Sequence, residues 1–307
     1  MKLRNRAKNA GQRIIVFGAP KTGKSELVGK LAKKFKLLWF DLEKGAGVLL
    51  KMPEEWQDNV ELIDLPDTRT FPIAIETMLK VIKGTPCDIC HEHGKVSCQL
   101  CKKEGKESTT VCLNDLAGKV SEWIVVVDSL TQLANSAMAH ITKNLGDDYK
   151  YEWDDYRKQG TLMDKFLSDV QQARYNIICI SHETQTEMDD GKTKLVPVAG
   201  TTNFSRNTAK YFDHVVHTEV KNRKHVFGSG TGFSITALTG SRSNVHIENQ
   251  KEGEQSLLPF FPTFEEQFGS GKTEAGVIED AAPDATERSE QNASISRLEQ
   301  LRASHRK

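Results

Sequence analysis

The stretch Gly18-Ala-Pro-Lys-Thr-Gly-Lys-Ser25 follows directly on the apolar run Arg13-Ile-Ile-Val-Phe17, and together they decide the fold. The stretch matches the pattern G-x-x-x-x-G-K-[ST], in which glycines let successive backbone N–H groups turn toward phosphate oxygens. A helix is expected over residues 25–35, and its N-terminus adds positive potential at the same point. The sequence therefore predicts a strand, a phosphate-binding loop and a helix that together bind a nucleoside triphosphate.

The side chains of this loop have separate expected roles. Lys24 is expected to reach the β and γ phosphates of ATP, and the Ser25 hydroxyl is expected to bind Mg²⁺. ATP and Mg²⁺ are therefore the predicted ligands. The predicted nucleotide-binding residues are Gly18, Ala19, Pro20, Lys21, Thr22, Gly23, Lys24 and Ser25.

The composition of the chain bears on whether it binds nucleic acid, crosses a membrane or is secreted. The 307 residues carry 42 basic and 42 acidic side chains, so any contact with nucleic acid must come from a local patch rather than from net charge. The apolar runs are too short to cross a membrane, and the basic arm at residues 1–12 lacks the apolar segment of a secretory signal. We expect a cytoplasmic protein with one large domain and no membrane-bound part.

The C-terminal segment 269–307 differs in composition from the rest of the chain. It is rich in Ser, Ala, Glu, Asp and Gly and contains no aromatic residue. A segment with so few apolar side chains cannot bury enough surface to offset the entropy of ordering it. A disordered tail is therefore predicted.

Four cysteines form two C-x-x-C pairs, at Cys87 and Cys90 and at Cys98 and Cys101. Two such knuckles can present four thiolates to one tetrahedral ion, which predicts a structural zinc site in a small insertion over residues 84–118. Four thiolates leave zinc no open position for catalysis. An iron–sulfur cluster uses the same ligands and is not excluded by the spacing, whereas disulfides suit a chain without an export signal less well.

Two later segments end in carboxylates. The apolar run at residues 122–128 ends in Asp128 and is followed by Ser129, and in phosphate-loop proteins such an aspartate lies beside the magnesium ion. The run at residues 37–41 leads into Glu43, just beyond the carboxyl end of a strand. A general base at this point could polarise water for attack on the γ phosphate, although a solvated loop residue is the alternative for Glu43.

The order of these motifs resembles that of the RecA-like recombination ATPases. The strand ends Asp41-Leu-Glu43 and Val127-Asp128-Ser129 carry the resemblance, which covers roughly residues 10–245. It implies an α/β fold with a parallel sheet covered by helices on both faces, formed by residues 13–83 and 119–268. In this family the glutamate of the Asp-x-Glu strand end is the catalytic base, which assigns that role to Glu43.

The resemblance also assigns roles after the next expected strand, residues 175–181. His182 stands where the family has a sensor of the γ phosphate, with a polar cap on the strand as the alternative. The polar stretch 184–206 resembles the mobile loop that contacts single-stranded DNA. The predicted phosphate contacts there are Lys192, Lys194 and Arg206. The predicted catalytic residues are Lys24, Glu43, Asp128 and His182.

Further strands are expected over residues 213–220 and 233–238, followed by Arg242. In the family a cation near this point reaches the ATP of a neighbouring subunit in a ring or filament, so a homo-oligomer is implied. Arg242 is the first candidate for this trans-acting cation, with Lys221, Arg223 and Lys224 behind it, and an ordinary surface charge is the alternative for Arg242. Acidic neighbours of the predicted DNA loop, such as Glu187 and Asp190, argue against a simple basic patch.

The chain is similar to short phage-encoded RecA-like ATPases used in single-strand annealing and recombination. By this resemblance we expect a compact RecA-like core without the N-terminal polymerisation segment and the separate C-terminal DNA-binding domain of bacterial RecA. The resemblance implies a DNA-dependent ATPase that acts on single-stranded DNA, with the tail or the zinc insertion as the docking point for a single-strand-binding or replication protein. The alternatives are a replicative helicase or helicase loader, and a non-catalytic nucleotide switch whose zinc insertion docks a protein.

Overall fold

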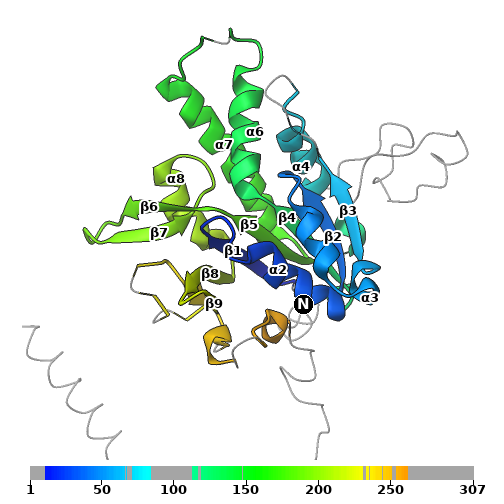
Figure 1. Ribbon diagram of the computed structural model, residues 1–307. Coiled ribbons are helices and arrows are strands. Elements are labelled where there is room, and N and C mark those ends of the chain that lie inside the picture. The colour runs from blue at the N-terminus through cyan, green and yellow to red at the C-terminus, as the bar shows by residue number, and fades with distance from the viewer. Residues whose placement is uncertain are drawn as a thin grey trace, which may run out of the picture. The chain divides into compact units, whose positions relative to one another are not determined.

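The computed structural model describes the greater part of the chain between residues 11 and 261 (Figure 1). The described residues are 11–65, 67, 71–83, 113–116, 119–146, 148–230, 233–234, 236–243, 245–250 and 254–261. They all belong to the compact unit Met1–Phe264, and the second unit, Glu265–Lys307, lies outside them. Most of the basic arm, the four paired cysteines and the expected disordered tail therefore lie outside the described residues.

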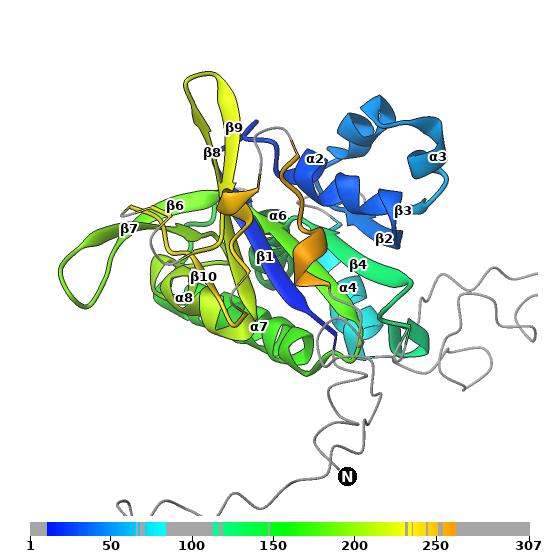
Figure 2. The same cartoon turned by 90° about the horizontal axis from the view of Figure 1, so that it is seen from below.

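A mainly parallel sheet forms the centre of the described structure (Figure 2). Its strands are β1 (Arg13–Gly18), β2 (Lys36–Asp41), β3 (Val60–Asp64), β4 (Trp123–Asp128), β5 (Asn176–Ser181), β8 (His214–Lys221), β9 (Lys224–Gly228) and β10 (Gly240–Ser241). Within the described residues the order is β10-β8-β1-β5-β4-β2-β3, and β9 also pairs with β8. Six neighbouring strands of the described structure are mutually parallel, in the order β8, β1, β5, β4, β2 and β3. Their carboxyl ends therefore lie along one edge of the sheet.

The central strands are buried on both faces because their apolar side chains alternate between two cores. In β1, Ile15 and Phe17 belong to one core, whereas Ile14 and Val16 belong to the other. The strands β2, β4 and β5 divide in the same way. Continuous apolar runs of this kind are typical of parallel strands covered on both sides, and the expected α/β layering is confirmed.

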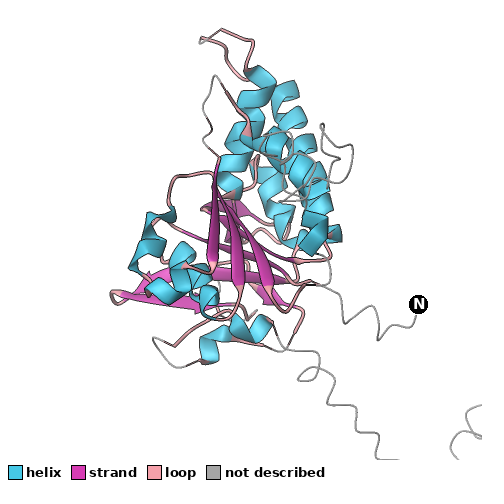
Figure 3. Cartoon of the chain, turned by 90° about the vertical axis from the view of Figure 1, so that its right-hand side faces the viewer, coloured by secondary structure: helices cyan, strands magenta, loops and turns pink. Residues whose placement is uncertain are grey.

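Helices cover the two faces of the sheet, and the layers are visible in Figure 3. One core is closed by α4 (Ala74–Lys83), η3 (Leu113–Leu116), α6 (Leu130–Thr142) and α7 (Trp153–Gln172). The other is closed by α2 (Lys24–Gly29), η1 (Lys30–Lys33), η2 (Ala46–Lys51), η5 (Ile247–Asn249) and η6 (Leu258–Phe260), with α3 (Glu54–Gln57) beside them. In the part of the chain that the structure describes, no helix combines the length and apolar character needed to cross a bilayer.

The segment after β5 corrects one expectation. Instead of a loop over 184–206, the chain forms an antiparallel hairpin of β6 (Glu183–Glu187) and β7 (Thr193–Pro197), then α8 (Thr202–Asn207) and η4 (Thr208–Tyr211). Gly191, with a φ of 74°, makes the tight turn that lets the two strands pair. The hairpin projects beside the sheet in Figure 1.

The strand expected over residues 213–220 is confirmed as β8, but the strand expected over 233–238 is wrong. The described residues there form a loop with a single bridge between Ala237 and Leu195. The backbone of Leu195 donates to Thr236 and accepts from Leu238, so this segment bonds to the β6–β7 hairpin rather than extending the main sheet.

Candidate functional site

The loop between β1 and α2 has the conformation that a phosphate-binding loop requires. Lys21 and Gly23 have positive φ angles of 65° and 88°, which turn the backbone back toward the first turn of α2. A Cβ atom at Gly18 would lie 2.2 Å from the Thr218 carbonyl oxygen of β8, so only glycine fits there. The loop therefore curls at the carboxyl end of β1 and presents its backbone N–H groups at the start of a helix.

Lys24 is buried within this loop. Its Nζ donates hydrogen bonds to the carbonyl oxygens of Gly18 at 2.9 Å and Ala19 at 2.7 Å. Burial lowers the pKa of the ammonium, and the nearby carboxylates of Asp128 and Glu43 oppose that effect. Among the described residues, the ammonium donates its hydrogen bonds to neutral carbonyls. A phosphate would be a stronger partner because its hydrogen bond with the ammonium is charge-assisted.

Ser25 and Asp128 meet across the carboxyl edge of the sheet. The Ser25 hydroxyl donates to Asp128 Oδ2 at 2.9 Å, although the two residues are 103 positions apart. Burial raises the pKa of Asp128 to about 7, against the hydrogen bond from Ser25, which favours the charged form. A hydroxyl and a buried carboxylate are the hard oxygen ligands that suit Mg²⁺ when phosphates and water complete its shell. This donor set fits the predicted magnesium site.

Asp41 anchors the turn that carries Glu43. Its carboxylate accepts hydrogen bonds from the backbone N–H groups of Glu43 and Gly45, both at 3.1 Å, and of Ala46 at 2.9 Å. In the sequence, Asp41 stands out only as part of the Asp-x-Glu pattern. An aspartate two residues before the functional side chain, followed by a glycine, is the signal for such a turn.

Glu43 is held between the ends of β4 and β5. The Ser129 hydroxyl, directly after β4, donates to Glu43 Oε1 and also accepts from the backbone of Gln132 in the first turn of α6. On the other side, His182 Nε2 lies 3.5 Å from Glu43 Oε2. The structure thus brings together Glu43 and His182, which the sequence predicted separately.

His182 is itself fixed by groups that the sequence argument missed. Its backbone N–H donates to Thr131 Oγ1 at 2.9 Å, and its carbonyl accepts from the backbone of Val198 at 2.9 Å. The Ser181 hydroxyl donates to the Val198 carbonyl at 2.7 Å. His182, which contacts the Glu43 carboxylate, is therefore hydrogen-bonded directly to Val198, where the chain leaves the β6–β7 hairpin.

These side chains surround one cavity of about 460 Å³. It is lined by Pro20, Lys21, Gly23, Lys24, Ser25, Glu26, Glu43, Gly45, Val48, Lys51, Asp128, Ser129, Ile180, His182 and His225. It lies at the carboxyl edge of the parallel strands, where open α/β sheets bind their ligands. All four predicted catalytic residues line it.

Comparison with known families agrees with this geometry. Residues 10–246 match the family model described as an AAA domain, and the match covers well over half of the chain. The chain belongs to the AAA domain family. The AAA domain match and the cavity together place the protein among the P-loop ATPases.

Solved structures add a distant likeness. An ATPase from the type III secretion system of pathogenic bacteria is similar to this AAA domain at 14% sequence identity and a TM-score of 0.40. The similarity covers 71% of this chain and 55% of that one, so the chain spans about half the length of that ATPase. Among curated proteins, no match is found.

The cations predicted to contact DNA lie apart from the cavity of the AAA domain. Lys192 is in the turn of the β6–β7 hairpin and pairs with Asp190 at 3.4 Å, while Lys194 is on β7. Arg206 on α8 pairs with Asp189 at 2.9 Å. The structure brings the three cations to one hairpin and its following helix, with carboxylates among them.

Arg242 follows β10, beside the beginning of β8. It pairs with Asp213 at 2.8 Å, at the amino edge of the sheet and opposite the nucleotide loop. Its trans-acting role in a neighbouring subunit stays a prediction.

The predicted zinc ligands lie outside the described residues; they are Cys87, Cys90, Cys98 and Cys101. Within the part that is described, no group of three or more His, Cys, Asp or Glu side chains could hold a metal ion on its own. Cys179, on β5, is a buried core residue, and burial strongly raises the pKa of its thiol.

Proposed function

We propose that this AAA domain hydrolyses Mg²⁺-ATP and couples hydrolysis to single-stranded DNA in recombination or strand annealing. The observation that carries the hydrolytic part is the placement of Glu43. Asp41 anchors the backbone of Glu43, and Ser129 and His182 contact its carboxylate, in the same cavity as Lys24 and Ser25. A carboxylate held in this way beside the phosphate-binding loop is placed as a general base requires.

The arrangement divides the chemistry among a few side chains. Lys24 leaves the Gly18 and Ala19 carbonyls and donates to the β and γ phosphates, which lowers the cost of the developing negative charge. Ser25 and Asp128 would hold Mg²⁺, which supplies further charge neutralisation at the phosphate oxygens when it is bound.

Glu43 is the base in this proposal. Water oxygen bonds to the γ phosphorus, the bond from that phosphorus to the bridging oxygen breaks, and the water proton passes to the Glu43 carboxylate while ADP leaves. Ser129 and His182 hold the carboxylate in position for that transfer. A positioned base of this kind typically contributes about 10²-fold to 10⁴-fold to the rate.

The coupling to DNA is supported by the connection between His182 and the hairpin. β6 begins at Glu183, the residue after His182, and Val198, directly after β7, donates its backbone N–H to the His182 carbonyl. Lys192, Lys194 and Arg206 would bind DNA phosphates. Since Asp190 and Asp189 pair with two of these cations, DNA must displace the carboxylates, which lowers its affinity. Binding should weaken with salt because cations that neutralise DNA phosphates release bound counterions.

Further parts of the proposal rest on sequence pattern and resemblance. The four paired cysteines are proposed to bind structural zinc, and the test is the zinc content of Cys87→Ser, which should lose the metal and retain ATP binding. Assembly into a ring or filament, with Arg242 acting on the ATP of a neighbour, is tested by sedimentation with and without ATP. Kinship with short phage-encoded RecA-like annealing ATPases, and a replication partner at the tail or zinc insertion, are proposed on the same basis.

The deciding experiment is ATP hydrolysis by the purified protein with and without single-stranded DNA, at two salt concentrations. Lys24→Ala serves as the blank. Stimulation that declines as salt rises supports a DNA-linked ATPase, and an annealing assay beside an unwinding assay then separates recombination from a helicase. Hydrolysis without stimulation contradicts the DNA coupling, and bound ATP without hydrolysis favours a nucleotide switch.

A further inference from the structure

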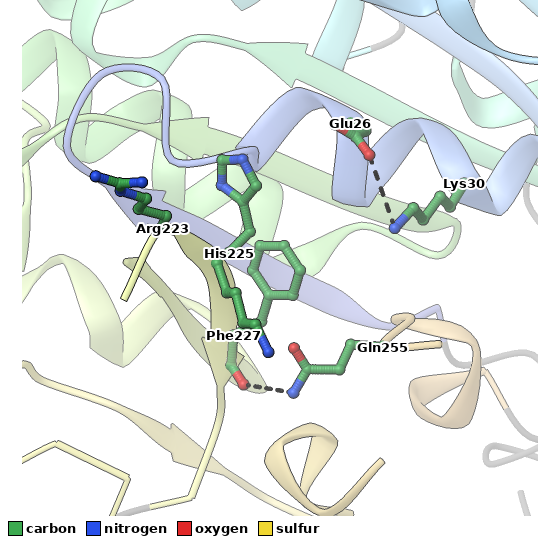
Figure 4. A pocket seen from close by; sticks show the side chains of 7 residues that line it. Glu26, Lys30, Arg223, His225, Phe227 and Gln255 are labelled. Atoms are coloured by element: carbon green, nitrogen blue, oxygen red, sulfur yellow. Dashed lines mark hydrogen bonds and ion pairs between the residues drawn. The ribbon is translucent and has the colours of Figure 1, made fainter. Parts of the chain in front are cut away.

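A second cavity of about 340 Å³ lies beside the first and has no part in the mechanism above (Figure 4). It is lined by Glu26, Lys30, Arg223, Lys224, His225, Phe227 and Gln255. Glu26 and His225 also line the cavity at the phosphate-binding loop. The two cavities therefore meet at the first turn of α2 and the middle of β9.

The orientation of a bound triphosphate follows from the residues already placed. Its γ phosphate must lie toward Glu43 and His182, since these groups act there. The α phosphate and the ribose must then lie at the opposite end, near Glu26. From this position the ribose and base extend away from the loop either toward β9 or toward η2. The η2 residues Val48 and Lys51 form part of the wall of the first cavity.

β9 stands directly against the phosphate-binding loop. A Cβ atom on Gly23 would lie 3.2 Å from His225 Nδ1 and 3.6 Å from Phe227 Cζ. The two rings come from alternate residues of β9 and so face the same side of that strand, as Figure 4 shows. The β9 exit therefore offers the exposed His225 ring beside the edge of the largely buried Phe227 ring, whereas the η2 exit offers Val48 and Lys51.

Gln255 supplies a polar group of fixed direction to the second cavity. The residue is 8% exposed, and its Nε2 donates to the carbonyls of Phe227 at 3.5 Å and Ile247 at 3.4 Å. Because an amide N–H₂ rather than an amide oxygen must face two carbonyls, Oε1 is directed the other way. Figure 4 shows this oxygen turned toward the Phe227 ring and the interior of the cavity.

We propose that the second cavity receives the base of the bound nucleotide, with His225 and Phe227 as its ring surface and Gln255 Oε1 as acceptor for an exocyclic amino group. Adenine carries such a donor at C6. Hypoxanthine, the base of inosine triphosphate, carries an oxygen there, which would face Oε1 as a second acceptor. This inference rests on the proposed nucleotide binding and adds the part of the chain that selects the base.

The test compares three ligands by calorimetric titration: ATP, inosine triphosphate and inorganic tripolyphosphate, each with Mg²⁺. The wild type should bind ATP about 5-fold to 10-fold more tightly than inosine triphosphate, as expected for one hydrogen bond. Gln255→Leu should remove that preference and leave tripolyphosphate affinity unchanged. Phe227→Leu should weaken ATP and inosine triphosphate alike, by about 5-fold or more, because base stacking is lost.

Two variants make the comparison decisive. Gln171→Leu removes an exposed amide that makes a similarly long bond to a backbone carbonyl, and it should change none of the affinities. Val48→Ala probes the η2 exit and should leave the ATP preference intact. The proposal is overturned if the wild type does not discriminate the two bases, or if Val48→Ala and not Gln255→Leu changes the ratio.

Other outcomes separate this inference from the proposed function. A wild-type protein that binds neither ATP nor tripolyphosphate contradicts nucleotide binding itself. If Phe227→Leu loses affinity for tripolyphosphate together with ATP, the substitution has disrupted the fold. The test of the base site then rests on Gln255→Leu and its ratio of ATP to inosine triphosphate affinity. An unchanged ratio there overturns the assignment of Gln255.

Discussion

Charged side chains at the two edges of the parallel sheet have different kinds of partner. At the amino edge, Asp213 accepts hydrogen bonds from the guanidinium groups of Arg13 and Arg242, and His214 bonds Gln12 and Ser241. At the carboxyl edge, the hydrogen bonds that the Lys24 ammonium makes within the described structure go to carbonyl oxygens.

The carboxyl edge also holds Asp128 with a raised pKa, and Glu43 nearby raises it further. The amino edge is therefore satisfied by the chain alone, while the carboxyl edge has groups whose best partners are a phosphate and a cation. Buried charged groups with shifted pKa values cluster where ligands bind. The comparison predicts that substitutions at the amino edge mainly affect stability and those at the carboxyl edge mainly affect function.

The largest effect on stability should come from Asp213→Ala. The substitution leaves the partly exposed Arg13 and the exposed Arg242 without their shared carboxylate, and losing these charge-assisted hydrogen bonds should cost about 3 kcal/mol of unfolding free energy. Urea unfolding measures the loss. Asp189→Ala breaks an exposed aspartate–arginine pair and should cost less than about 1 kcal/mol, so equal losses in the two variants would contradict the assignment of Asp213 to a structural cluster.

His214 should make the amino edge sensitive to acid. Burial lowers its pKa to about 4, whereas the unfolded chain has a histidine pKa of about 6.5. Between these values the unfolded state binds a proton that the native state does not, so stability falls as pH drops from 6.5 toward 4. The loss is about 2 to 3 kcal/mol. Unfolding at pH 7.5 and pH 4.5 should show a steeper loss for the wild type than for His214→Gln, and equal losses would refute this.

At the carboxyl edge, Asp128→Asn should have an effect of opposite sign. Because burial raises the pKa of Asp128 from 3.8 to about 7, the native state loses stability as pH rises between these values, and the full cost of the charge is present above them. Without Mg²⁺ at pH 8, the variant should be as stable as the wild type or more stable by about 1 kcal/mol. It should nevertheless lose hydrolysis. A clear destabilisation of the metal-free variant would show that Asp128 is needed for the fold.

The smallest effect is expected for Arg242→Ala. The Arg242 side chain is 64% exposed, and Arg13 still pairs with Asp213 when it is removed. The loss of stability should be about 1 kcal/mol or less, measured by urea unfolding. A loss as large as that of Asp213→Ala would show that the exposed arginine, not the inner one, holds the cluster together.

The parts of the site that could be predicted from the sequence are those whose residues lie close together along the chain. The loop from Gly18 to Ser25 needs a fixed local spacing of glycine, lysine and serine, and Asp128 follows a continuous apolar run. Each therefore has a local signal. The meeting of Ser25 and Asp128 follows from the rule that parallel strands share a carboxyl edge.

Other contacts join residues that local patterns cannot relate. Ser129 bonds Glu43 across 86 positions, and Gln255 reaches the Phe227 carbonyl across 28. The strand expected over 233–238 failed for a related reason. Its apolar residues suggested a place in the main sheet, but its backbone bonds Leu195 of the hairpin instead.

The central claim is that Glu43 is the base of a hydrolytic site at the carboxyl edge. The most direct measurement is single-turnover ATP hydrolysis by Glu43→Gln, with ATP binding measured on the same sample. Glu61→Gln, on the exposed strand β3, is the matched control, and Lys24→Ala reports any contaminating ATPase. The account predicts unchanged ATP affinity and a hydrolysis rate lower by about 100-fold or more. A Glu43→Gln protein that hydrolyses ATP at the wild-type rate would contradict it.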